Sequence, residues 1–157
     1  MSAAGEGKRR VVVLGVGNLL IVDEGIGVRC IEELERRPSL GPDVACVDGG
    51  TSTHELMEDL ENLDTLVIVD AAATGRAPGT IVRLEGDSIP SSFSNKMSPH
   101  QHGINDLLAS LALLGRAPKR VVLFGVEPHT IALGMELSPV VAATIPELCA
   151  RVASEVG

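Results

Sequence analysis

The chain has 157 residues, a length typical of one domain, whose core needs no disulfide or structural metal. The formal net charge is −8, so no basic face is expected for phosphate backbones. The two aromatic residues, Phe93 and Phe124, are too few for a base-stacking surface. The chain is therefore not expected to bind nucleic acid.

The cysteines and the N-terminal sequence indicate in which cellular compartment the protein works. Cys30, Cys46 and Cys149 form no CxxC pair and are predicted to be buried thiols in a reducing environment. A cationic run at 8–10 imitates a signal peptide, but glycines interrupt the apolar stretch behind it, and no window is long enough to cross a membrane. We expect a cytoplasmic monomer without membrane contact, one domain over residues 1–157 with a loose tail at 1–8.

Strands and helices alternate from residue 11 on. A continuous β-branched run predicts a buried strand at 11–16. Apolar residues at helical spacing predict a helix at 25–36, which Pro38 stops. A second strand at 44–47 is expected to end in a turn, Asp48-Gly49-Gly50.

The middle of the chain predicts a short helix, two strands and a long loop. Ser52 or Thr53 is expected to cap a helix that carries Leu56, Met57 and Leu60. A buried strand at 65–69 ends at Asp70. A strand at 80–84 follows too closely for a helical crossover, so it should be an antiparallel edge strand. Residues 86–102 are predicted to form a polar loop, of a length often linked to function.

The last third predicts a helix, a strand and a helix. Leucines at helical spacing follow Ile104, and 121–126 is the last buried strand. Ser138 as N-cap and Pro139 at the first position open a final helix, which Pro146 should kink. This order predicts a three-layer α/β/α domain, with a mostly parallel twisted sheet of about five strands, one antiparallel edge strand, and a phosphorylase- or hydrolase-like arrangement.

Acids and histidines follow the predicted strands. Asp23 and Glu24 come after the first strand, Asp48 after the second and Asp70 after the third, and His100 lies in the long loop. In open α/β sheets, ligands bind at the carboxyl ends of the strands. Carboxylates with an imidazole suit a divalent transition metal such as nickel, iron, zinc or manganese.

A nucleotide site is a competing interpretation of the same region. Gly15-Val16-Gly17 after a strand suggests a dinucleotide fingerprint, with Asp48 as the ribose-binding acid. However, Leu20 occupies the third glycine position, and the acids at 23 and 24 would repel a pyrophosphate. The pattern therefore disfavours a nucleotide-binding regulator.

Several blocks together resemble the hydrogenase maturation endopeptidase family over about residues 10–155. The matching blocks are Gly15–Leu20, Asp23–Gly27, Asp48–Thr51, Val69–Ala71, Pro78–Thr80, Ser98–Gln101, Gly125–Val126 and Leu137–Pro139. Each block alone would be weak, but their order matches as well. One departure is His102, where relatives can carry an apolar residue, so a second imidazole near the site stays open.

The resemblance implies an aspartic-type or metal-dependent endopeptidase. It implies that Glu24, Asp70 and His100 hold nickel, supplied by the substrate, and it makes Asp48 a further catalytic candidate. The substrate would be a nickel-loaded precursor of a nickel-iron hydrogenase large subunit, which loses a C-terminal peptide. A nickel-binding chaperone without peptidase activity is the alternative.

Plainer roles exist for each of these side chains. Glu24 could favour a helix dipole, Asp70 could cap a turn, His100 could be solvated, and Asp48 could hold its glycine turn. Glu127 is expected to cap a loop, and ordinary surface positions are expected for His54, His102 and His129. If the resemblance holds, Glu24, Asp70 and His100 should converge, the Asp48 turn should border the same cleft, and the loop from Gly86 to Pro99 should be mobile and grip the substrate.

Overall fold

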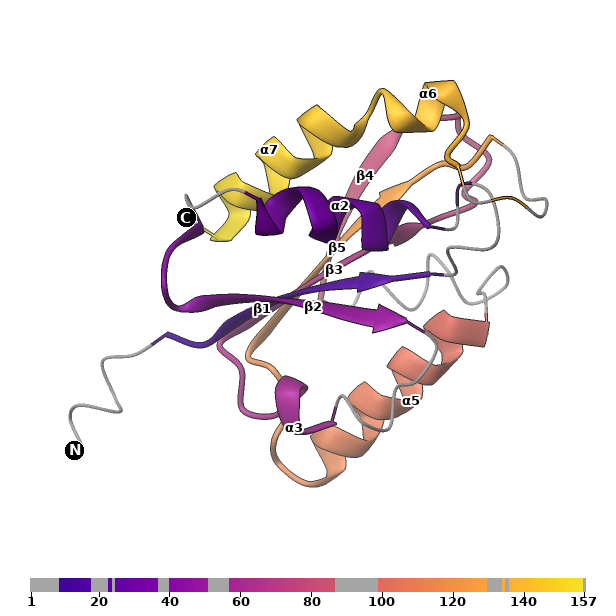
Figure 1. Cartoon of the computed structure of the whole chain (residues 1–157). Helices are drawn as coiled ribbons and strands as arrows, with labels where there is room; N and C mark the ends of the chain where they lie inside the picture. The colour runs from indigo at the N-terminus through magenta and orange to yellow at the C-terminus, as the bar shows by residue number, and fades with distance from the viewer. Residues whose placement is uncertain are drawn as a thin grey trace.

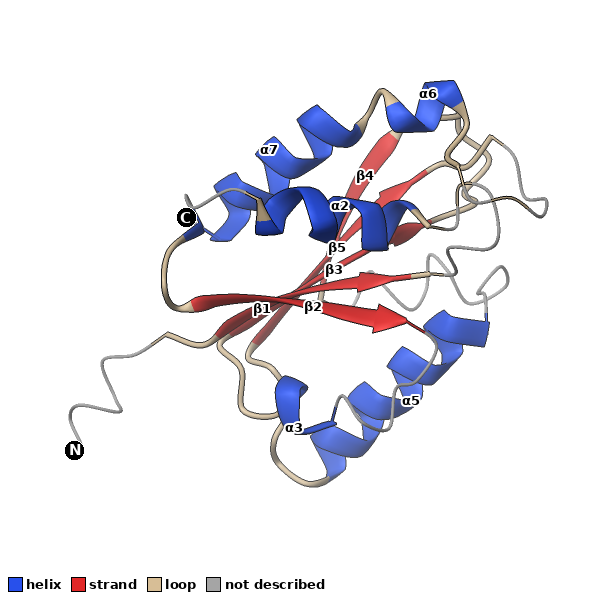
Figure 2. Ribbon diagram, in the orientation of Figure 1, coloured by secondary structure: helices blue, strands red, loops and turns tan. Residues whose placement is uncertain are grey.

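The described part of the chain forms a single sheet with helices on both faces (Figure 1, Figure 2). The structure is a computed structural model that describes residues 9–17, 23, 25–36, 40–50, 57–86, 99–129, 134 and 136–156. Within these residues, no helix combines the length and the hydropathy needed to span a membrane.

The sheet has five strands in the order β2-β1-β3-β5-β4. Their bounds are β1 Val11–Val16, β2 Val44–Gly50, β3 Thr65–Ala71, β4 Ile81–Glu85 and β5 Arg120–Val126. Every neighbouring pair is parallel except β4 with β5, which is antiparallel. The predicted fold class is therefore confirmed, with its antiparallel edge strand.

The helices lie in two layers, as Figure 2 shows. One face of the sheet is covered by α2 (Ile26–Glu35), α6 (Pro139–Ala142) and α7 (Ile145–Val156), and the other by α3 (Met57–Leu60) and α5 (Pro99–Leu113). Each layer has its own apolar cluster, because successive strand residues point to opposite faces. In β1, for example, Val13 joins the α2 and α7 cluster, whereas Leu14 joins the α3 and α5 cluster.

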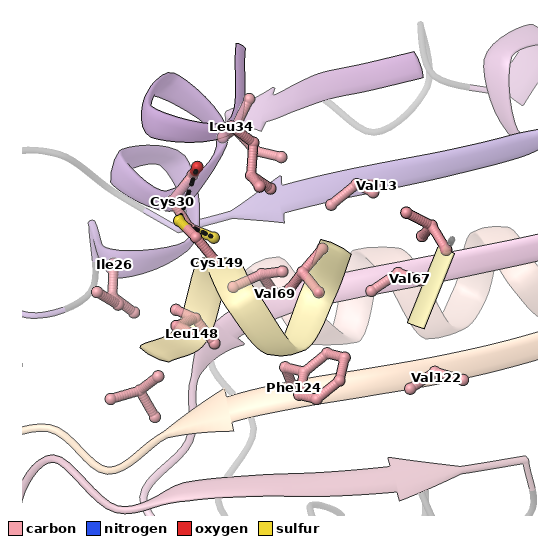
Figure 3. Packing of buried hydrophobic residues seen from close by; sticks show 14 of the residues in the cluster. Val13, Ile26, Cys30, Leu34, Val67, Val69, Val122, Phe124, Leu148 and Cys149 are labelled. Atoms are coloured by element: carbon pink, nitrogen blue, oxygen red, sulfur yellow. Dashed lines mark hydrogen bonds between the residues drawn. The ribbon is translucent and has the colours of Figure 1, made fainter. Parts of the chain in front are cut away.

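Two cysteines meet inside the α2 and α7 cluster (Figure 3). Cys30 on α2 and Cys149 on α7 are wholly buried, and their sulfur atoms lie 3.7 Å apart as free thiols. Cys46 is only partly buried. Burial and the nearby Glu35 raise the pKa of the Cys46 thiol, which favours its protonated form. The prediction of buried thiols is thus confirmed for Cys30 and Cys149, whereas Cys46 is only partly buried.

Three sequence-based boundaries need correction. Asp48-Gly49-Gly50 is not a turn but the end of β2, where the pairing shifts so that Gly15 lies opposite Asp48 and Val16 opposite Gly50. The helix α5 begins at Pro99, inside the predicted loop 86–102, because a proline fits the first helical position. The final helix is broken rather than kinked, since Ala143 and Thr144 separate α6 from α7 ahead of Pro146.

Candidate active site

Asp70 is the second-to-last residue of the central strand β3. The side chain is 3% exposed, and its Oδ1 accepts a hydrogen bond of 2.8 Å from the backbone N–H of Ala71. Alternation along β3 puts Asp70 on the same face as Leu66 and Ile68, which pack in the cluster beneath α5. A buried carboxylate therefore lies at the carboxyl edge of the sheet, on the side of α5.

Asp48 lies at the same edge but on the other face. It is opposite Gly15, which on its far side pairs with Val69, so two strand spacings, about 10 Å, separate the backbones of β2 and β3 here. Asp48 is exposed and shares the face of Cys46, which packs against the α2 cluster. Asp48 and Asp70 are thus no directly bonded pair of carboxylates, and the catalytic role of Asp48 stays a prediction.

His100 lies in the first turn of α5, not in a loop. Figure 1 shows this turn at the same edge of the sheet as the arrowheads of β1 and β2 and the start of α2. The side chains of 99–105 lie outside the described part of the structure, as do Glu24, His54 and residues 87–98. Among the described residues no three His, Cys, Asp or Glu side chains gather to hold a metal. The convergence of Glu24, Asp70 and His100, and the behaviour of the predicted loop, stay predictions.

Two glycines bring the start of α2 against the strands that end at the site. A Cβ atom on Gly27 would lie 2.2 Å from the carbonyl oxygen of Val69 and 2.4 Å from that of Val16. A Cβ atom on Gly15 would lie 2.5 Å from the carbonyl oxygen of Gly27. The backbone of α2 therefore touches β3 at the residue before Asp70. This close packing accounts for the glycine pattern after β1 without a nucleotide.

Asp23 is a site-edge residue whose role the sequence pattern did not reveal. It is wholly buried and has a left-handed backbone with φ of 65°, a conformation that aspartate tolerates better than most residues. Its carboxylate accepts hydrogen bonds from the backbone N–H of His129, at 2.8 Å, and from that of Ser138, at 2.8 Å. The loop after β1 is thereby joined to the chain after β5.

Ser138 binds Asp23 through its hydroxyl and does not cap the helix with it, contrary to the prediction. It occupies the N-cap position of α6 with Pro139 next, as expected, but its hydroxyl makes no capping hydrogen bond. The Oγ atom lies 2.9 Å from Oδ1 and 2.8 Å from Oδ2 of Asp23, and it donates its one proton to that carboxylate. His129 has the exposed position that was expected, although its N–H joins the same group.

Glu127 caps a loop, as predicted. It follows β5 and is 7% exposed, and its Oε1 accepts hydrogen bonds from the N–H and hydroxyl of Thr74, at 2.8 and 2.7 Å, and from the N–H of Arg76, at 3.2 Å. Burial alone would raise the pKa of Glu127, but these hydrogen bonds outweigh it and hold the pKa below its ordinary value. The charged form is therefore the one that the fold stabilises.

This capping carboxylate gives a pH-dependent prediction. A carboxyl whose pKa is lower in the folded state stabilises the fold above its unfolded pKa, and the stabilisation is lost as pH falls through the folded pKa. We expect Glu127→Gln to lower the free energy of unfolding by about 1–3 kcal/mol at pH 7. The difference from the wild type should shrink below about pH 4.5. Urea unfolding across this range measures it, with exposed Glu58→Gln as the control; a gap that is constant with pH would contradict the assignment.

Comparisons with known proteins identify the family. A family model described as hydrogenase maturation protease matches residues 28–155. The hydrogenase 2 maturation protease of Escherichia coli K12 is 45% identical over 137 residues, which cover 87% of this chain and 84% of that protein. The hydrogenase expression/formation protein HupD of Rhodobacter capsulatus is 41% identical over 138 residues, which cover 87% of this chain and 66% of that protein.

Solved structures agree in fold. The hydrogenase maturating endopeptidase HybD of Escherichia coli superposes with a TM-score of 0.88 at 42% identity, covering 94% of this chain and 91% of that one. A [NiFe] hydrogenase maturation protease HybD from Thermococcus kodakarensis superposes with a TM-score of 0.81 at 27% identity, covering 94% and 99%. The α/β domain of this chain is thus that of a maturation endopeptidase. The chain belongs to the hydrogenase maturation protease family.

Proposed function

We propose that this enzyme removes the C-terminal peptide of a nickel-loaded precursor of a nickel-iron hydrogenase large subunit. Family membership supports a peptidase over a nickel chaperone without activity. The observation that carries the site is the buried carboxylate of Asp70 at the carboxyl edge of β3, with the start of α2 packed beside it. One peptide bond is hydrolysed, and water supplies the hydroxyl of the new carboxyl group and a proton of the new amine.

The nickel ion of the precursor is the group by which the substrate is recognised. We propose Asp70, with Glu24 and His100, as its ligands, because carboxylate and imidazole donors suit nickel. Asp48 is a further catalytic candidate at the same edge, on the other face of the sheet. Cys30 and Cys149 are wholly buried in the core, so neither can serve as a nucleophile. The class that we propose is therefore metal-dependent, with carboxylates in place of a covalent nucleophile.

The proposed ligand set predicts an enzyme that does not store its own metal. Three ligands leave coordination positions open, unlike the closed four-ligand sites of structural zinc. We expect elemental analysis of tag-free purified enzyme to find well under one nickel or zinc ion per chain. We also expect a full-length precursor without nickel to resist cleavage. One firmly held ion per chain contradicts the first expectation, and efficient cleavage of the nickel-free precursor contradicts the second.

The experiment that tests the function is direct. The purified enzyme is incubated with a nickel-loaded large-subunit precursor, and the mass of the precursor is followed. Loss of one C-terminal peptide supports the proposal, whereas nickel exchange without a change in mass would favour the chaperone. We place the reaction in the cytoplasm, because three cysteines without a CxxC pair are typical of a reducing compartment.

A further inference from the structure

The carboxylate of Asp23 is the centre of a buried connection between two loops at the active edge. We call Asp23, His129 and Ser138 the Asp23 link. The carboxylate is reached by two backbone N–H groups and one hydroxyl, all at 2.8–2.9 Å. Its partners come from 106 and 115 residues further along the chain. Such charge-assisted hydrogen bonds are stronger than neutral ones, so the link fixes both loops.

The Asp23 link lies beside the end of the central strand β3. Asp23 follows β1, whereas His129 and Ser138 follow β5, and β3 lies between these two strands. The link therefore joins the two loops that flank the end of β3, where Asp70 lies. Two residues beyond Gly25, the backbone of Gly27 touches the carbonyl oxygen of Val69, next to Asp70. The described start of α2 thus packs against β3 at the residue before Asp70.

We propose that Asp23 is a positioning residue, whose hydrogen bonds to His129 and Ser138 hold the chain after β1 and the chain after β5 in place on the two sides of Asp70. This inference rests on the proposed role of Glu24 and Asp70 in receiving nickel. The carbonyl oxygen of Asp23 also accepts the N–H of Ile26, at 3.4 Å, so the backbone at Asp23 is coupled to the first turn of α2. A loosened link would let the start of α2 move relative to Asp70.

The test compares two link variants with a core variant. Asp23→Asn places an amide N–H₂ among hydrogen-bond donors, and Ser138→Ala removes only the hydroxyl. Val152→Ala, in the α7 layer of the core, supplies a loss of stability without touching the link. Tag-free proteins are titrated with Ni²⁺ alone by calorimetry, at a temperature where circular dichroism shows all of them folded. The rate of precursor processing is measured on the same samples.

The expected results separate positioning from stability. Groups that orient metal ligands change metal affinity or activity by about 10–100-fold, so Asp23→Asn should weaken Ni²⁺ binding and processing in that range, and Ser138→Ala less. Val152→Ala should lower the melting temperature and leave both unchanged. If the link variants lose stability but match the wild type in Ni²⁺ affinity and rate, the positioning role is overturned. If the wild type itself neither binds Ni²⁺ nor cleaves the precursor, the proposed function fails instead.

Discussion

Gly27→Ala is expected to displace α2 and to abolish most of the processing activity. An alanine is a better helix former than glycine by about 1 kcal/mol, so an isolated helix would gain stability. Here the added Cβ would lie 2.2 Å from the carbonyl oxygen of Val69 and 2.4 Å from that of Val16, and neither backbone can yield cheaply. The helix has to move outward by about 1 Å in an interior packed as densely as a crystal. We expect a loss of about 3 kcal/mol or more in the free energy of unfolding.

The control lies on the same helix. Glu32→Ala removes an exposed side chain that pairs with Arg29 at the surface, and it should change the free energy of unfolding by less than about 0.5 kcal/mol. Urea unfolding of the three proteins, with precursor processing below the unfolding transition, measures both effects. A Gly27→Ala protein as stable as the wild type would show that α2 does not press on β1 and β3.

Asp70→Asn is expected to slow processing by at least about 10–100-fold, the loss seen when even a group that orients a metal ligand is removed. Asparagine has the shape of aspartate, and its oxygen can keep the hydrogen bond from the N–H of Ala71. The fold should therefore remain, while a charged ligand for the nickel of the precursor is lost. Initial rates of cleavage, with circular dichroism of the same samples, separate the two effects.

Asp64→Asn is the matched control, because Asp64 precedes the same strand at its other end. Its carboxylate accepts the N–H of Arg10 at 2.7 Å and pairs with Lys119, and these groups lower its pKa. This variant should lose a little stability and keep its processing rate. Equal rates for the Asp70→Asn and wild-type enzymes would reduce Asp70 to a cap on the end of its strand.

The sequence allows the strands to be predicted well because their signal is local. The β-branched run at 11–16 matches β1 residue for residue, whereas β2 and β3 extend past their predicted ends. Those added residues pair with neighbouring strands: Asp48 lies opposite Gly15 and Asp70 opposite Gly125. Pairing between distant segments leaves no mark on the pattern inside one segment.

The start of α5 has a sequence signal for a helix N-terminus. Ser98-Pro99 is the same opening as Ser138-Pro139, which correctly predicted the start of α6. Applied to both places, it would have put His100 in a first helical turn rather than in a loop.

The faces of Asp48 and Asp70 could not be predicted in the same way. Strands that are apolar on both sides, such as β1 and β3, show no alternation from which a facing could be derived. The role of Asp23 was hidden for a further reason, because its partners are 106 and 115 residues away.

The helix α7 covers one face of the sheet, and this arrangement affects folding during translation. The strands β1 and β3 and the helix α2 leave the ribosome before α7, whose Leu148, Val152 and Val156 close the same apolar layer. At synthesis rates of about 5–20 residues per second, the valines of that sheet face stay exposed for several seconds before α7 is made. We expect nascent chains that stop before α7 to be cut by protease at the sheet and to bind chaperones. Chains that include it should resist, because the apolar layer is closed once α7 packs on it.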